Sequence, residues 1–217
     1  MTDLVDPTPL ALHRPTLRFQ EFVCRECHRH GRHHDALMLA WTAFEDRPAL
    51  PTYQHLVDHA TQTGVWPEWR PRAIAVLRRH VEEAREAATS RNGTNRHVFP
   101  FHPPGAAVLI EVLLWEGDID GAWEEALSGD CSHRLWMRLA DARQATHPGD
   151  AIPVYQREVE QLINLRHYGA AVEVMDHIRH LRVRAGQPEE FRGDVAPVRA
   201  THTAKRKLMQ LLDANGW

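Results

Sequence analysis

Apolar residues recur along most of the chain at the spacing of an amphipathic helix. In LRFQEFVCRECH, residues 17–28, the apolar positions largely follow the i, i+3, i+4 rule, and AVLIEVLLWEGD, residues 107–118, repeats that spacing. No long segment alternates apolar and polar residues, as a half-buried strand would. We therefore predict an all-α fold.

Short polar breaks separate the helical segments at intervals. They read HGRHHDA (30–36), QTGVWPE (62–68), WEGDIDGA (115–122), THPGDA (146–151) and LRHYGAA (165–171). Each contains a turn residue, and several lead into small residues that open another helix. This punctuation predicts helical hairpins joined end to end.

The hairpins fit a degenerate tetratricopeptide pattern, in which small residues let two antiparallel helices approach and large ones fill the gaps. In the first unit the turn is Gly31, and Ala36 and Ala43 take the small positions of the second helix. Gly64 and Gly117 mark later turns. The matching positions of later units are Tyr53, Leu56, Val57; Leu109, Leu113, Ala122, Ala126; Trp136, Leu139, Ala140, Ala151, Tyr155; and Tyr168, Ala171, Met175, Ile178, Leu181.

This pattern predicts a tetratricopeptide-like, right-handed stack of about five hairpins, an α-solenoid. We divide it into an N-terminal extension (1–15), two hairpins (16–89), a loop (90–105) and C-terminal hairpins (106–217). A last amphipathic helix, roughly residues 200–214, is expected to cap the stack. The helix before the loop, about residues 68–89, is long and charged.

Composition narrows the class of protein. The chain has 217 residues and a formal charge of -3, so no global field favours nucleic acid or an acidic membrane. It contains no apolar run of about 18 residues and no signal-peptide pattern at its start, so we expect a cytoplasmic protein without a membrane span.

The segment CRECHRHGRHHD, residues 24–35, raises the question of a zinc site. Cys24, Cys27 and His28 are the alternative ligands, but no second ligand pair follows at the usual distance. His33 and His34 lie across the turn, about 10 Å from Cys24 along the helix axis. We favour no metal and no cofactor, with both cysteines as core residues of the first hairpin.

Two features are candidates for partner binding. Arg18, Glu21, Arg25 and Arg29 lie on the first helix, where they would face a groove and suit an acidic peptide. Phe99 and Phe101 lie in the loop, where a partner could cover them. A solvated helix face and rings folded onto the stack are the simpler alternatives.

Catalytic patterns are missing from the sequence. It has no glycine-rich phosphate loop, G-x-S-x-G or H-E-x-x-H motif. Its adjacent carboxylate pairs point apart on a helix. A basic C-terminal run with Arg199, Lys205, Arg206 and Lys207 leaves nucleic-acid binding as a less favoured alternative. We therefore expect a protein that is not an enzyme.

The chain from about Leu17 resembles the uncharacterised helical region that lies C-terminal to the zinc finger in bacterial SWIM zinc-finger proteins. The resemblance is carried by GRHHDALMLAWTAFEDRPALPTYQHLVDHA, VLIEVLLWEGDIDGAWEEA, CSHRLWMRLA, HPGDAIPVYQREVEQLI, HYGAAVEVM and KRKLMQLLDANG. It implies a tetratricopeptide-like scaffold of unknown activity. The finger's own C-x-C…C-x-H ligands are absent, so its zinc function does not carry over.

We therefore expect a non-catalytic scaffold that binds a peptide or partner protein in its groove. The alternative is a zinc- or nucleic-acid-associated accessory factor related to SWIM zinc-finger proteins.

Overall fold

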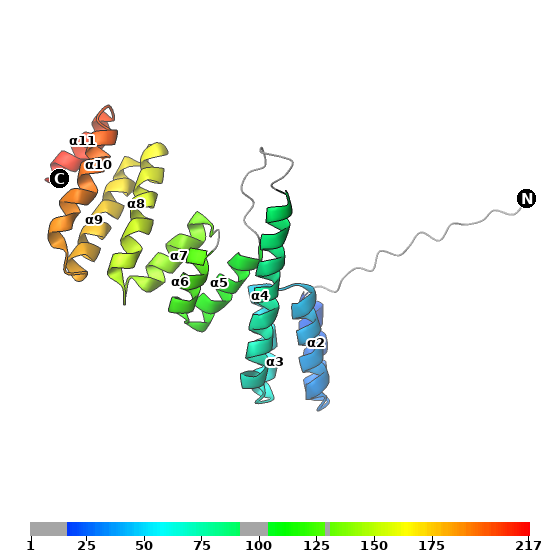
Figure 1. Cartoon of the computed structure of the whole chain (residues 1–217). Coiled ribbons are helices and arrows are strands. Elements are labelled where there is room, and N and C mark those ends of the chain that lie inside the picture. The colour runs from blue at the N-terminus through cyan, green and yellow to red at the C-terminus, as the bar shows by residue number, and fades with distance from the viewer. Residues whose placement is uncertain (1–16, 92–103, 129–130) are drawn as a thin grey trace, which may run out of the picture. The chain divides into compact units, whose positions relative to one another are not determined.

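The computed structural model describes residues 17–91, 104–128 and 131–217, and it describes side chains over 19–87, 106–128 and 131–217. All regular structure in these ranges is helical, which confirms the all-α class (Figure 1). None of these helices is both long enough and apolar enough to cross a membrane. The chain separates into two compact units, residues up to 77 and residues 78–217.

The first unit is built from two helical hairpins. It contains α1 (Leu17–Arg29), α2 (His33–Asp46), α3 (Leu50–Gln62) and the first half of α4 (Trp66–Arg91). Helix α2 packs against both α1 and α3. Its core includes Phe44 and Tyr53, whose rings meet edge to face with centroids 5.7 Å apart. Ala36 and Ala43 are buried, as the repeat pattern predicts.

The second unit continues the hairpin arrangement. After the second half of α4 it holds α5 (Pro104–Glu116), α6 (Ile119–Ser128), α7 (His133–Arg143), α8 (Pro148–Asn164) and α9 (Tyr168–Arg184), followed by a 3-10 turn (Pro188–Glu190), α10 (Phe191–Thr201) and α11 (Arg206–Ala214). From α5 to α10 each helix packs against the next one in sequence, most extensively α8 with α9, and α11 packs against α9 (Figure 1). The predicted core positions Ala122, Leu139, Tyr155 and Met175 are all buried.

Glycine follows the end of several of these helices for a conformational reason. Gly31, Gly64 and Gly117 have φ of 72°, 73° and 81°, a left-handed conformation that other residues adopt at a cost. The amide after each one donates back to a carbonyl five residues earlier, as from Arg32 to Cys27 at 2.8 Å. The predicted hairpin turns are therefore confirmed.

The C-terminal prediction was wrong in one respect. Instead of one capping helix over roughly 200–214, α10 ends at Thr201 and α11 begins at Arg206. His202 lies in the turn between them, where its buried ring is 2.8 Å from Glu160 of α8. Pro197 and Gly193 lie within α10. Both residues have low helix propensity, so the sequence did not predict this helix. Most of the predicted loop lies outside the described residues.

Candidate functional sites

The first unit contains a buried cluster of metal-ligating side chains. Cys24 of α1 and His55 and His59 of α3 each place one donor atom so that all three atoms lie within 4.8 Å of one another. The residues are 0%, 8% and 6% exposed. Among the described residues this is the one group of three or more such side chains close enough to hold a metal ion.

Two further histidines connect this cluster to the surface. Nε2 of His28 lies 2.5 Å from Nδ1 of His59, and their rings stack with centroids 4.7 Å apart. Nδ1 of His28 lies 2.6 Å from Nδ1 of His33, which is exposed. The cluster therefore continues through hydrogen-bonded rings from the interior to solvent.

Burial keeps the cluster in its uncharged forms at neutral pH. Burial, reinforced by the charge of Cys27, raises the pKa of the Cys24 thiol to about 11. Burial and the neighbouring His55 and His28 lower the pKa of His59 to about 4. Burial also lowers the pKa of His55, against the opposing charges of Glu21 and Asp58. Neutral imidazoles are the form of histidine that binds metals.

The hydrogen bonds of the cluster leave one nitrogen unsatisfied. The Cys24 thiol donates to the backbone carbonyl of Ala36 at 3.5 Å. Nε2 of His55 is buried and has no hydrogen-bond partner among the described residues. Unpaired buried polar atoms are rare in native proteins and call for a specific explanation, such as a missing ion.

Helical spacing explains how the sequence builds this cluster. Cys24 and His28 are four residues apart on α1, and His55 and His59 are four residues apart on α3. Side chains with that separation share one face of a helix. His55 and His59 were not among the predicted site residues, although the spacing H-x3-H within QHLVDHA places both on one helix face.

The predicted metal alternative is only partly reproduced by the structure. Cys24 lies in the cluster and His28 contacts it through His59, whereas Cys27 is half-buried and outside the group of close donor atoms. The other two members of the cluster, His55 and His59, come from α3 of the second hairpin rather than from the histidines of the first turn. His55 and His59 were not predicted because they lie far from Cys24 along the chain.

The residues predicted to bind a partner lie in different environments. Glu21 is half-buried and close enough to influence the charge of His55. Arg25 is exposed, and the exposed Arg29 pairs with Glu26 at 2.7 Å. The side chain of Arg18, together with Phe99 and Phe101, lies outside the described residues.

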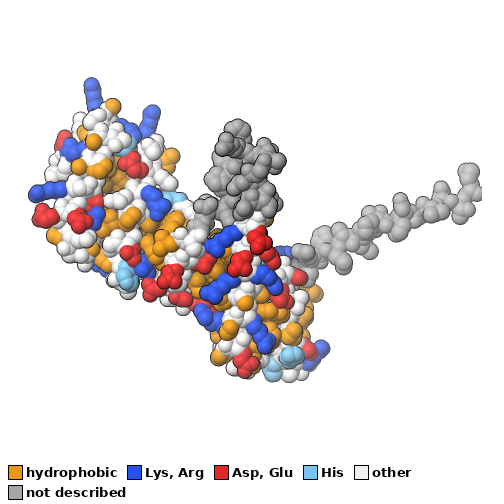
Figure 2. All heavy atoms as spheres, viewed as in Figure 1, with side chains coloured by type: hydrophobic (Ala, Val, Ile, Leu, Met, Phe, Trp, Pro, Cys, Tyr) orange, Lys and Arg blue, Asp and Glu red, His pale blue; other side chains and the backbone are white. Residues whose placement is uncertain are grey.

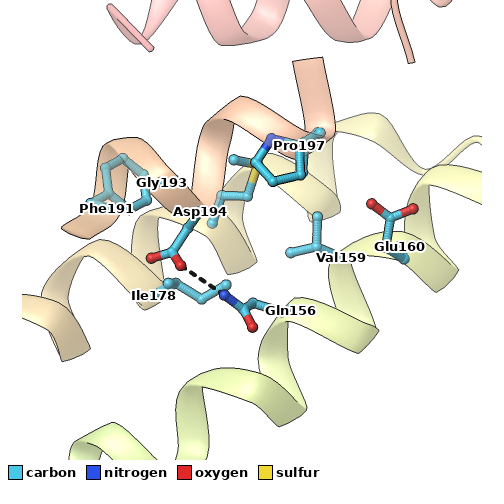
Figure 3. Close-up of a pocket in the computed structure, with 10 residues that line it drawn as sticks. Gln156, Val159, Glu160, Ile178, Phe191, Gly193, Asp194 and Pro197 are labelled. Atoms are coloured by element: carbon cyan, nitrogen blue, oxygen red, sulfur yellow. Dashed lines mark hydrogen bonds between the residues drawn. The ribbon is translucent and has the colours of Figure 1, made fainter. Parts of the chain in front are cut away.

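The second unit has a cavity of about 240 Å³ between α8, α9 and α10 (Figure 3). Its walls are largely apolar and include Val159, Met175, Ile178, Phe191, Pro197 and Val198. Gly193 also lines the cavity, and a Cβ atom added there would meet nothing within 4 Å.

The polar groups of this cavity are already bonded to one another. Asp194 accepts two hydrogen bonds from the guanidinium of Arg182, both 2.9 Å, and a third from Gln156 at 2.7 Å (Figure 3). The Asp194 side chain is only 6% exposed. Glu160 pairs with His202 at 2.8 Å. Neither carboxylate is therefore poised as a free acid or base.

Comparison with known proteins gives no relative for this chain. No family model, curated protein or solved structure matches it.

Proposed function

We propose that the chain is a non-catalytic helical scaffold, arranged as a tetratricopeptide-like right-handed stack, that binds a peptide segment of a partner protein. The observation that carries this proposal is the cavity between α8, α9 and α10. It offers apolar walls, and its polar edge groups are already paired. An apolar side chain of the peptide would enter the cavity.

The size of the cavity favours one side chain over a metabolite. At about 240 Å³ it is smaller than the roughly 300–1,000 Å³ of typical small-molecule sites. The Glu160 side chain lies at the edge of the cavity and is 45% exposed. Its carboxylate could therefore pair with a basic residue of the peptide next to the apolar side chain that enters the cavity. The earlier expectation of an acidic partner concerns α1 and stays a separate prediction.

Nucleic-acid binding receives less support. Arg199 of the basic C-terminal run is engaged by Asp213 and by the carbonyl of Trp217. On the face shown in Figure 2, Lys and Arg side chains are interspersed with Asp and Glu. A nucleic-acid site would instead gather unpaired cations on one surface.

Zinc association is a second candidate function, and the cluster of Cys24, His55 and His59 is the observation that favours it. The relation to SWIM zinc-finger proteins stays a proposal that rests on the sequence resemblance alone.

Gly193 offers a direct test of peptide binding at the cavity. Replacing it with leucine would fill the space without a backbone clash, because the added Cβ meets open space. Gly169 of α9 is a matched control, since it is also helical, its added Cβ also meets nothing within 4 Å, and it is not part of the cavity lining.

Peptides selected from a random displayed library against the full chain provide the ligand. We expect them to carry an apolar anchor, to lose at least tenfold in affinity for Gly193→Leu and to bind Gly169→Leu like wild type. Peptides that bind both variants equally, or a library that yields none, would contradict the proposal.

A further inference from the structure

We propose that Cys24, His55 and His59 bind one Zn²⁺ ion, and that His28 and His33 orient His59 from outside the coordination shell. This proposal rests on the second candidate function, zinc association, and it is independent of the peptide cavity, which lies in the second unit. The Zn²⁺ ion would be the ligand of this cluster, and its presence would explain why Nε2 of His55 has no hydrogen-bond partner.

The spacing of the three donor atoms suits zinc. With Zn–S near 2.3 Å and Zn–N near 2.0–2.1 Å, tetrahedral ligand atoms lie about 3.3–3.6 Å apart. The donor atoms of Cys24, His55 and His59 already lie within 4.8 Å of one another, so small side-chain rotations close the site. A fourth position is left for a water molecule, as in zinc sites with three protein ligands.

The chemical types of the donors also select the metal. One thiolate and two imidazoles suit zinc, whereas magnesium and calcium prefer oxygen ligands. Binding converts the Cys24 thiol to a thiolate, which forms the Zn–S bond, and the thiol proton leaves to solvent. The Cys24 thiol gives up its contact with the Ala36 carbonyl in that exchange.

The tautomers of the hydrogen-bonded histidine rings decide which nitrogen of His59 is free. If Nδ1 of His28 donates a hydrogen bond to His33, then Nε2 of His28 accepts a hydrogen bond from the Nδ1–H of His59. Nε2 of His59 then carries its lone pair and can bind the ion. Metal-bound histidines usually donate the N–H of their second nitrogen in this way, and the group that accepts this hydrogen bond holds the ring in place.

A purely structural cluster explains these residues less well. A packed core would satisfy its polar atoms or replace them with apolar ones, yet Nε2 of His55 is buried without a partner. An ion would satisfy that nitrogen and link α1 directly to α3. The first hairpin would thereby be tied to the second.

Cobalt(II) is the probe for the test, because it occupies zinc sites and its thiolate bond absorbs in the near ultraviolet. The full chain is purified without a histidine tag, freed of metal by a chelator, titrated with Co²⁺ and then competed with Zn²⁺. We expect about one equivalent of Co²⁺ to produce the thiolate band and Zn²⁺ to abolish it.

Single variants distinguish the residues that bind the ion from residues that only lie near it. Cys24→Ala should remove the band, and His55→Ala should weaken Co²⁺ binding by at least a hundredfold. His28→Ala, as a positioning variant, should weaken it by about ten- to a hundredfold and keep the thiolate band. Cys27→Ala is the matched control, one helical turn from Cys24, and should bind like wild type. Circular dichroism verifies the helical content of each variant.

The wild-type spectrum decides the proposal even if a variant fails to fold. If wild-type protein shows no thiolate band, the proposed site is wrong. If Co²⁺ binds without a thiolate band and still binds to Cys24→Ala, the ion is attached only to surface histidines, and the site is equally wrong. Loss of the band in Cys27→Ala, with His55→Ala unaffected, would move the ligands to the first helix and equally overturn it.

Discussion

Small residues at helix contacts are the feature that most strongly limits substitution. Ala36 and Ala122 are both 0% exposed, and each lies where the hairpin pattern requires a small side chain. Arginine at either position would bury an unpaired charge in a packed interface. The contact leaves no room for the longer side chain either.

We expect Ala36→Arg and Ala122→Arg each to lower the free energy of unfolding by roughly 4 kcal/mol or to prevent folding. Thermal melts of the full chain measure this. Ala75→Arg and Ala196→Arg, at exposed helical positions, are the controls and should change stability by about 0.5 kcal/mol or less. Equal melting of all four variants would show that the packing register is wrong.

Arg166 occupies a backbone conformation that the other hairpin turns assign to glycine. Its φ is 62°, and the amide of His167 donates to the carbonyl of Leu162 at 2.8 Å, as in the glycine turns. In this conformation a non-glycine residue raises the free energy of the folded state by roughly 1–2 kcal/mol. Part of this difference from glycine is offset, because glycine loses more conformational freedom on folding.

Arg166→Gly should therefore stabilise the chain by about 0.5–1 kcal/mol in denaturant unfolding. The converse variant Gly117→Ala, at φ 81°, should destabilise it by about 1 kcal/mol. A loss of stability in Arg166→Gly would mean that the arginine side chain contributes more than its backbone costs.

At the scale of elements, sequence patterns located most helices because their signals are local. Turn glycines and small-residue spacing lie within a few positions of the helix ends they define. Helix α10 was missed because Gly193 and Pro197 weaken a local pattern, while the burial of Phe191 and Val198 holds the helix in place. Packing of these side chains against neighbouring helices therefore stabilises α10, although its own residues have low helix propensity.

His177 of α9 lies between Tyr155 of α8 and Gln144, the residue that follows α7. His177 donates from Nε2 to Gln144 at 2.7 Å and lies edge-on to the ring of Tyr155. Burial lowers its pKa below 6.5, with His180 and Arg184 adding to the effect and Asp141 and Asp176 opposing it. The folded protein thus binds this proton less readily than the unfolded chain.

The sign of the stability change follows from this lowered pKa. Above the unfolded value of about 6.5 both states are neutral, and below it the unfolded state gains a proton first, so stability falls with falling pH. We expect His177→Gln to lose less stability than wild type between pH 7 and pH 5, measured by urea unfolding. Parallel losses in both proteins would contradict the shift.

At the scale of the molecule, the two units carry different candidate functions. The second has an apolar cavity with paired edge groups, and the first has a buried Cys/His cluster. The H-x3-H spacing shows that His55 and His59 share one face of a helix, but not that this face lies against Cys24, which is 31 residues before His55. Nothing in the local spacing of either helix shows which face of α3 lies against α1.

Zinc content most directly tests whether the cluster of Cys24, His55 and His59 is a metal site. Elemental mass spectrometry is applied to the untagged full chain, to the double variant His55→Ala/His59→Ala, and to His30→Ala/His34→Ala as a control of exposed histidines. We predict about one zinc per chain in the wild type and control and almost none in the first double variant. No zinc in any of them after purification in zinc-supplied medium, or equal zinc in all three, would contradict the claim.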